Sequence, residues 1–229
     1  MNPGVFVTGT DTGVGKTFAS CVLIEALRSR GVHVVPMKPI AAGAIAHDGG
    51  WANEDTLALM QAAGCPASLA AEVTPVLLRE PMAPHIAAAR EGRTIDLAPV
   101  WPAWARLAKA GTFSVVEGVG GFRVPLGSGL DTVDLARTYA LPLVMVVGMR
   151  LGCLNHALLT AEAIGRAGLA LAGWIANTID PQMAVADENV GALRERLGAP
   201  LLGRLPWAPQ AGARSLAPWL DVAPLLAER

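Results

Sequence analysis

A glycine-rich segment near the start of the chain ends in a lysine followed by a threonine, reading TGTDTGVGKT over residues 8–17. It follows a short apolar run and precedes a stretch of helical character. Glycines such as Gly13 and Gly15 let a backbone approach phosphate closely, a helix N-terminus adds partial positive charge, and Lys16 can reach the outer phosphates. The usual loop opens with a glycine where this chain has Thr10, but that position is permissive. We therefore predict a phosphate-binding loop rather than a glycine-rich turn with a solvated lysine.

Oxygen ligands for a divalent cation could come from three places along the chain. Thr17 supplies a hydroxyl directly after the loop lysine, where phosphate loops hold Mg²⁺. Glu117 follows an apolar run in VVEGVGG and would face the phosphates from a strand end, although it could also be a solvated loop acid. Asp55, in NEDTLAL, lies at a predicted helix start, where an acid more often caps the helix or complements its dipole. From the residues alone, Glu117 is the stronger of the two carboxylate candidates.

Lys38 ends a second apolar run, in the segment PMKPIAAG. A lysine at a strand end near a phosphate loop can neutralise the charge that develops on a transferred phosphoryl group. A lysine in such a place is otherwise usually a surface charge, and the residue alone slightly favours that interpretation.

The elements that must position these residues alternate along the chain. Apolar runs of strand length occur at Val5–Val7, Val32–Met37, Phe113–Val116, Leu143–Val147, Leu171–Ala176 and Leu201–Leu205. Helical stretches occur at Lys16–Arg30, Asp55–Ala63, Leu97–Lys109, Thr132–Tyr139, Asn155–Arg166 and Asp187–Leu197. This alternation predicts a mostly parallel sheet with helices on both faces. Ligands of such folds bind at the carboxyl ends of the strands, where the phosphate loop, Lys38 and Glu117 fall.

No segment has the composition of a linker, so we expect residues 1–229 to form one α/β domain. The proline-rich segments Pro81–Pro84 and Pro200–Pro218 are expected to be loops or irregular edges. Of the 229 residues 52% are hydrophobic, and the formal net charge is −1. We therefore expect neither a nucleic acid nor a membrane as partner. Three widely separated cysteines and no secretory signal predict reduced thiols and a cytoplasmic protein.

A series of longer segments occurs in a fixed order along the chain: VTGTDTGVGKT, MKPIAAG, EDTLAL, VVEGVGGFRVPL, VVGMRLGCLNHALLT, LAGWIAN and LLGRLPW. Together they resemble dethiobiotin synthetase, over roughly residues 3–210. The phosphate loop is shared with many ATPases, whereas GCLNHALLT together with LPW is specific to this family. The resemblance implies a P-loop NTPase-like fold and a Mg²⁺- and ATP-dependent ligase. Its implied reaction closes a cyclic urea on 7,8-diaminononanoate with CO2, through a carbamate and a carbamic–phosphoric anhydride, and gives dethiobiotin, ADP and phosphate.

The same resemblance implies roles for individual residues. The implied nucleotide contacts are Thr12, Gly13, Val14, Gly15, Lys16, Thr17, Phe18, Asp55, Glu117, Gly118, Val119, Gly120, Asn177, Thr178, Pro206, Trp207 and Ala208. The implied Mg²⁺ ligands are Thr17, Asp55 and Glu117, which favours the ligand role of Asp55 over the capping role. Lys38 and Lys16 are the implied catalytic residues. The implied substrate contacts are Ala42 and, from the neighbouring subunit of a homodimer with a shared active site, Gly152, Cys153, Leu154 and Asn155.

Two departures from the family pattern concern substrate and nucleotide contacts. Ala42 stands where members often have a hydroxyl residue, and the segment APQAGARS after Trp207 lacks an acid that some members carry near the nucleotide. Two other functions remain as alternatives. A regulatory ATPase of the plasmid-partition or septum-site kind would have a lysine at Asp11 and a membrane helix or basic surface. An amide-forming ligase acting on cobyrinate would usually continue into a glutaminase domain.

Overall fold

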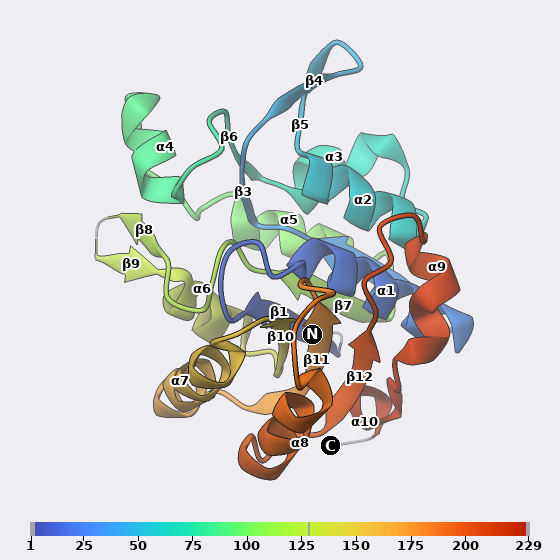
Figure 1. Cartoon of the computed structure of the whole chain (residues 1–229). Helices are drawn as coiled ribbons and strands as arrows, with labels where there is room; N and C mark the ends of the chain where they lie inside the picture. The colour runs from blue at the N-terminus through green and yellow to red at the C-terminus, as the bar shows by residue number, and fades with distance from the viewer. Residues whose placement is uncertain (1–2, 128, 228–229) are drawn as a thin grey trace.

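The computed structural model describes residues 3–127 and 129–227. Its main sheet contains six parallel strands in the order β12-β11-β10-β1-β7-β2, with β1 between β7 and β10 (Figure 1). These strands are β1 Gly4–Gly9, β2 Val34–Met37, β7 Phe113–Glu117, β10 Leu143–Met149, β11 Leu171–Thr178 and β12 Leu201–Leu205. The parallel sheet predicted from the apolar runs is therefore confirmed.

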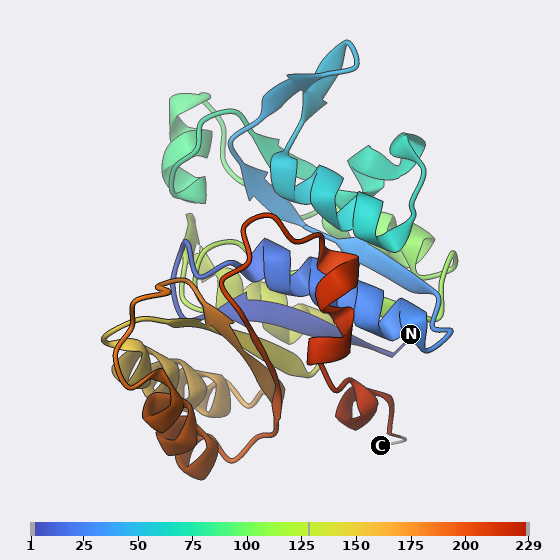
Figure 2. The ribbon, with the colours of Figure 1, turned by 45° about the vertical axis from the view of Figure 1, so that its right-hand side comes forward.

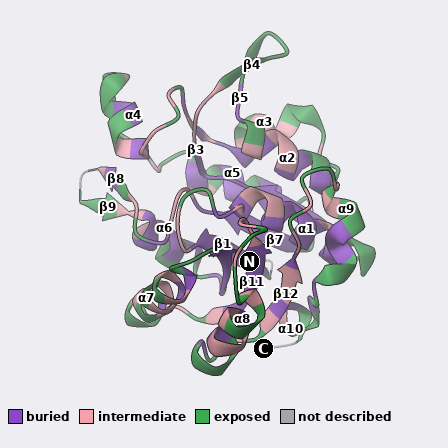
Figure 3. Cartoon of the chain, in the orientation of Figure 1, coloured by how far each residue is buried: buried purple, intermediate pink, exposed green. Residues whose placement is uncertain are grey.

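Helices cover both faces of this sheet, because alternate strand residues point to opposite sides. They are α1 Lys16–Ser29, α2 Glu54–Ala63, α3 Ala70–Val73, α4 Pro84–Arg90, α5 Val100–Leu107, α6 Thr132–Tyr139, α7 Cys153–Arg166, α8 Ala186–Arg196, α9 Ala213–Leu216 and α10 Ala223–Leu226. In β1, Val5 and Val7 belong to the core that contains α1, whereas Phe6 belongs to the core that contains α5 and α6. Met145 and Trp174 pack with α7 and α8. The strands are accordingly buried at the centre of the molecule (Figures 2 and 3).

Three short strand pairs were not predicted from the sequence. β3 (Ile40–Ala42) pairs in parallel with β6 (Val76–Leu78), while β4 (Ile45–His47) with β5 (Gly50–Ala52) and β8 (Pro125–Gly127) with β9 (Leu130–Asp131) are antiparallel. Each strand has only two or three residues, too few to show a periodic pattern. The β4–β5 hairpin projects from the body of the molecule (Figures 1 and 2).

The expectation of irregular structure in the proline-rich segments is wrong in part. Residues 200–218 include β12, which the apolar run Leu201–Leu205 does predict, and also α9 and the start of a 3-10 helix, Ala217–Trp219. Pro84 begins α4 and Pro218 lies in the first turn of its 3-10 helix. Proline is accepted there because the first N–H groups of a helix have no intrahelical partner.

The three cysteines Cys21, Cys65 and Cys153 are free thiols, as their spacing predicts. Burial, with a smaller contribution from nearby carboxylates, raises the pKa of the Cys21 thiol to about 12. No helix in the two described ranges is long and apolar enough to cross a bilayer.

Candidate active site

The phosphate loop joins the end of β1 at Gly9 to the start of α1 at Lys16. Gly13 and Gly15 have φ angles of 75° and 77°, in the left-handed region that residues with a Cβ adopt only with strain. Gly15 is also the N-cap of α1 and makes no side-chain capping bond. Because no capping side chain competes for the amide groups of the first turn, the loop has the backbone of an anion-binding site.

Asn177, in β11, fixes this loop from the neighbouring part of the sheet. Its Nδ2 atom donates a hydrogen bond of 2.9 Å to the carbonyl oxygen of Val14. A Cβ added at Gly15 would lie only 2.2 Å from the same Nδ2 atom. Glycine is thus required at position 15 both for its φ angle and for the close approach of Asn177. The contact of Asn177 with a nucleobase stays a prediction, since here its amide group holds the loop.

Lys16 is buried at the first position of α1. Its Nζ atom donates a hydrogen bond of 3.2 Å to the carbonyl oxygen of Asp11, across the loop. Burial lowers the pKa of Lys16 below its ordinary value, and the nearby Glu117 offsets only part of this effect. The ammonium group therefore lies inside the loop rather than in solvent, as a phosphate-binding lysine should.

Lys38, directly after β2, lies between two carboxylates. Its Nζ atom is 2.6 Å from Oε1 of Glu117 and 2.9 Å from Oδ2 of Asp55. The Lys38 and Glu117 side chains are only 4% and 0% exposed. Burial by itself would lower the pKa of Lys38, but the two carboxylates outweigh it and hold that pKa above its ordinary value. The interpretation of Lys38 as a surface charge is therefore wrong, and so is that of Glu117 as a solvated loop acid.

The residues predicted to bind Mg²⁺ fit a hard cation. The hydroxyl of Thr17 donates a 2.8 Å hydrogen bond to Oε1 of Glu117. The second oxygen of Glu117, Oε2, is buried and has no hydrogen-bond partner among the described residues. A buried carboxylate oxygen of this kind calls for a cation or water. Within residues 3–127 and 129–227, no group of three or more His, Cys, Asp or Glu side chains could hold a metal. Mg²⁺ is usually held by one or two carboxylates and keeps water and phosphate oxygens as its other ligands.

Asp55 does not cap α2, because Asn53 does, but it lies in the first turn of this helix, where an acid complements the dipole. The Asn53 side chain accepts hydrogen bonds from the amides of Asp55 and Thr56, at 3.1 and 3.4 Å. Burial would raise the pKa of Asp55, but its interactions with Lys38 outweigh this and hold the pKa below its ordinary value. Asp55 is therefore an ionised partner of the lysine at the site.

Asn53 also has a second contact that sequence reasoning missed. Its Nδ2 atom donates to the carbonyl oxygens of Gly43 and Ala42, at 3.0 and 3.3 Å. The start of α2, which carries Asp55, is thereby tied to the loop that follows β3. Asparagine is a frequent N-cap residue, so the cap was predictable from the sequence, but this contact across the fold was not.

A cavity of about 650 Å³ lies in front of these residues. Of the predicted site residues it is lined by Thr12, Gly13, Gly15, Lys16, Thr17, Lys38, Ala42, Asp55, Val119 and Gly120. It is also lined by residues 81–84, reading PMAP, and by Val124, which form an apolar wall. This apolar wall was not predicted, because the proline-rich segment was interpreted only as a loop.

Other predicted residues lie elsewhere. Thr178, Pro206 and Trp207 line a separate cavity of about 350 Å³, together with Arg204 and Trp219. Residues 153–155 form the start of α7 and do not line the 650 Å³ cavity within the described residues. Glu117 is buried at the end of β7, the loop residue Val14 is buried in the core, and Phe18 packs against the same core from α1. The structure thus brings the phosphate, metal and lysine residues together, with Asn177 against the loop, and leaves Thr178, Pro206, Trp207 and residues 153–155 outside that cavity.

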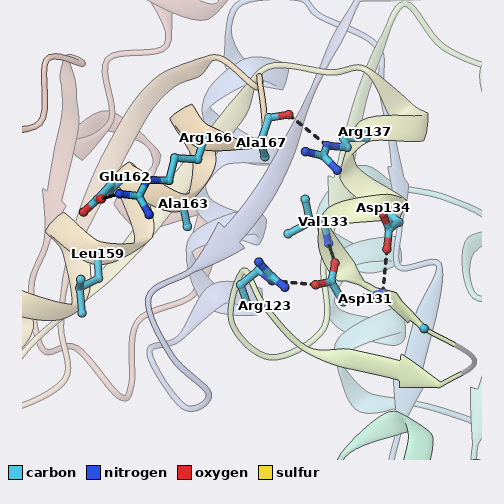
Figure 4. A pocket seen from close by; sticks show the side chains of 11 residues that line it. Arg123, Asp131, Val133, Asp134, Arg137, Leu159, Glu162, Ala163, Arg166 and Ala167 are labelled. Atoms are coloured by element: carbon cyan, nitrogen blue, oxygen red, sulfur yellow. Dashed lines mark hydrogen bonds and ion pairs between the residues drawn. The ribbon is translucent and has the colours of Figure 1, made fainter.

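A further cavity, of about 480 Å³, lies between α6 and α7 (Figure 4). Its walls carry Arg123, Arg137 and Arg166 together with carboxylates, and two of these arginines are paired with them. None of the predicted site residues lines it, so it is separate from the phosphate cavity.

The sequence matches the AAA domain family AAA_26 over residues 3–215. It is 51% identical to the ATP-dependent dethiobiotin synthetase BioD of Xanthomonas oryzae pv. oryzae over 220 residues, which cover 96% of this chain and 98% of that protein. The chain belongs to the dethiobiotin synthetase family. It is therefore an ATP-dependent ligase. The dethiobiotin synthetase of Aromatoleum aromaticum is 54% identical over 201 residues, or 88% of this chain and 89% of that protein.

Solved structures with a similar fold include more distant proteins. A ParA family ATPase from Chlorobium tepidum has a TM-score of 0.55 and 16% identity, covering 97% of this chain and 92% of that one. The septum site-determining protein MinD of Pyrococcus horikoshii, in complex with Mg-ADP, has a TM-score of 0.53 and 18% identity, covering 94% and 86%. Likeness at this identity shows the fold alone. The chain accordingly shares its P-loop NTPase-like fold with these two proteins, while the family assignment rests on the close relatives.

Proposed function

We propose that this enzyme forms dethiobiotin from 7,8-diaminononanoate, CO2 and Mg-ATP. The observation that carries the proposal is Lys38, which lies buried between Glu117 and Asp55 at the edge of the cavity that Lys16 and the phosphate loop also line. Such an arrangement suits a reaction in which a small anion attacks the outermost phosphate. The relatives at 51% and 54% identity, named as dethiobiotin synthetases, support the choice of substrates.

The proposed chemistry begins on one amine of the diamine. That amine takes up CO2 and loses a proton to give a carbamate, whose oxygen attacks the γ-phosphorus and releases ADP. The second amine then attacks the carbonyl carbon of the carbamic–phosphoric anhydride, phosphate leaves, and the cyclic urea closes. Because the carbamate is a poor electrophile before phosphorylation, the protein's task is to position the reactants and stabilise charge.

Two lysines divide this task. Lys16, in the loop, binds the outer phosphates, and Lys38 lies where the carbamate and the transferred phosphoryl group meet. Thr17, Asp55 and Glu117 would hold Mg²⁺, and the unpartnered Oε2 of Glu117 supports this assignment. When bound, Mg²⁺ neutralises charge on the phosphate oxygens.

The apolar part of the cavity fits the rest of the substrate. Ala42, Met82 and Ala83 present no charge to the cavity, and Val119 and Val124 complete the apolar wall. A diamine on a saturated carbon chain would bind with its polar end near the two lysines and its carbon chain against this wall. The same wall disfavours charged groups along the chain, because they would lose hydration without gaining a partner.

The test is phosphate release measured with each substrate omitted in turn. We expect release only when Mg-ATP, 7,8-diaminononanoate and bicarbonate are all present, with dethiobiotin formed in equal amount by mass spectrometry. Phosphate release at the same rate with and without the diamine would indicate a regulatory ATPase instead. Release that requires glutamine or ammonia, with no need for bicarbonate, would indicate an amide-forming ligase.

We also propose that residues 1–229 act as one ligase domain in a cytoplasmic homodimer with shared active sites. The amides of Leu154 and Asn155 in the first turn of α7, together with the helix dipole, suit the substrate's tail carboxylate. These residues do not line the phosphate cavity of their own chain. Leu151, just before α7, and Leu159, in α7, are 95% and 57% exposed, which supports an interface that covers them. The free thiols suit a reducing compartment.

Mixing two inactive variants should restore activity if the sites are shared. A Lys16→Ala chain lacks the loop lysine, and an Asn155→Pro chain lacks an amide donor at a position where the first helical turn tolerates proline. In random mixtures half of the dimers are hybrids with one intact site of two, so about one quarter of wild-type activity is expected. Subunit exchange is checked by native mass spectrometry with tagged chains. A monomer, or no recovery despite confirmed exchange, would contradict the shared site.

A further inference from the structure

An ion pair connects the phosphate loop to the segment that precedes α7. Nη2 of Arg150 lies 2.7 Å from Oδ2 of Asp11, and both side chains are half-exposed. Asp11 belongs to the loop, whereas Arg150 directly follows β10. An exposed pair of this kind adds little to folding stability, because solvent and salt screen it. Its two partners, however, have further contacts that make it the link between two parts of the site.

On the loop side, Asp11 is held at three atoms. Its Oδ1 atom accepts a 2.7 Å hydrogen bond from the amide of Thr12, Oδ2 contacts Arg150, and its carbonyl oxygen accepts from Nζ of Lys16 at 3.2 Å. The outer phosphates of a nucleotide would accept hydrogen bonds from the same Lys16 ammonium group, which has three N–H donors, that holds the Asp11 carbonyl. Binding of the nucleotide therefore acts on a contact of the same residue that holds Arg150.

On the other side, Arg150 holds the turn that starts α7. Its carbonyl oxygen accepts a 3.0 Å hydrogen bond from the amide of Cys153. The turn passes through Gly152 with φ at 95°, and Leu151 has few contacts because it is almost fully exposed. The side chain of Arg150 is thus attached to the loop, and its main chain to the first amide of α7.

We infer that the Asp11–Arg150 pair couples nucleotide binding at the loop to the start of α7. This inference rests on the proposed function, in which the α7 turn of one subunit completes the site of the other. The pair then joins the nucleotide site of one subunit to the substrate-carboxylate site of its partner, so the two active sites of the dimer communicate. A nucleotide that orders the loop also orders the turn, and the diamine binds with a smaller loss of conformational freedom.

The test combines two measurements on full-length protein. Hydrogen–deuterium exchange of residues 151–156 is followed with and without Mg²⁺ and adenylyl imidodiphosphate, and calorimetry gives the affinity for 7,8-diaminononanoate in both states. In the wild type we expect the nucleotide analogue to slow exchange in the turn and to tighten diamine binding by about fivefold or more. In Arg150→Met both effects should be largely lost, while Arg150→Lys should keep part of them.

Two further variants make the result specific. Asp11→Asn keeps an acceptor for the Thr12 amide but removes the charge, and combining it with Arg150→Met should add no further loss. Arg166→Met removes an arginine from an exposed ion pair with Glu162 at the other end of α7 (Figure 4), and both nucleotide effects should persist in it. Equal nucleotide effects in wild type and Arg150→Met would overturn the inference. If 7,8-diaminononanoate does not bind, but the nucleotide analogue still slows exchange in wild type and not in Arg150→Met, the proposed substrate is contradicted. The coupling of the loop to the turn would then still hold.

Discussion

Lys16→Ala is expected to lower turnover by about 10²–10³-fold, because it removes a fixed cation from the transferred phosphoryl group. Lys16 is buried at the first residue of α1, and its ammonium group already lies inside the loop. A neighbouring water cannot replace it there without reorganisation. The loss should appear in kcat and in the affinity for Mg-ATP, since the lysine contacts the phosphates both before and during transfer. Steady-state phosphate release and calorimetry measure the two effects.

Lys109→Ala is the matched control for this variant. The chain has only three lysines, and Lys109 is the one that lies outside the site, exposed after α5. Its removal changes net charge by the same amount and should leave turnover close to wild type. Wild-type turnover in Lys16→Ala would show that the loop does not act on the transferred phosphate.

The second large effect is expected for Lys38→Ala, in which turnover should fall by about 10²–10³-fold while ATP binding changes little. The charge of Lys38 matters most as the carbamate is phosphorylated. The substitution also leaves Glu117 buried without its nearest cation, and breaking a buried pair in this way destabilises a protein by about 3–5 kcal/mol. Chemical denaturation measures this loss, and calorimetry with Mg-ATP on the folded fraction measures binding.

Lys38→Arg separates the two consequences of that variant. It retains a positive charge beside Glu117, so most of the stability should return, whereas the larger guanidinium group displaces the charge from its position and keeps turnover low. Unchanged turnover with weakened ATP binding in Lys38→Ala would make Lys38 a contact of the bound nucleotide and not of the reaction.

Much of the fold follows from periodicity. The six strands of the main sheet fall within mostly apolar segments that alternate with helical stretches, so the sequence shows where each strand lies. The boundaries Thr132–Tyr139 and Leu201–Leu205 agree with the structure residue for residue. The short strands β3 to β6 could not be predicted, because two or three residues carry no pattern and their pairing depends on the sheet beside them.

The site was predictable where local sequence determines geometry. The glycines and Lys16 form the loop by themselves, so TGTDTGVGKT indicates a phosphate site without knowledge of the rest. The environment of Lys38 was not predictable in this way, because its burial depends on Glu117 from a strand that pairs beside β2. The apolar wall at Pro81–Pro84 was not predictable either, since only the tertiary fold brings this proline-rich segment and Ala42 into the same cavity.

The central position of β1 also has a consequence for how the chain is made. Gly4 pairs with Ser114 and Phe6 with Leu143, so both neighbours of the first strand are synthesised long after it. While the ribosome produces the intervening residues, the apolar strand that later carries the phosphate loop has no partner within the sheet. Contacts so distant in sequence form slowly, and an unpaired apolar strand can associate with other chains meanwhile. The newly made protein should therefore depend on chaperones until β10 has emerged, and chains ending before β7 should aggregate.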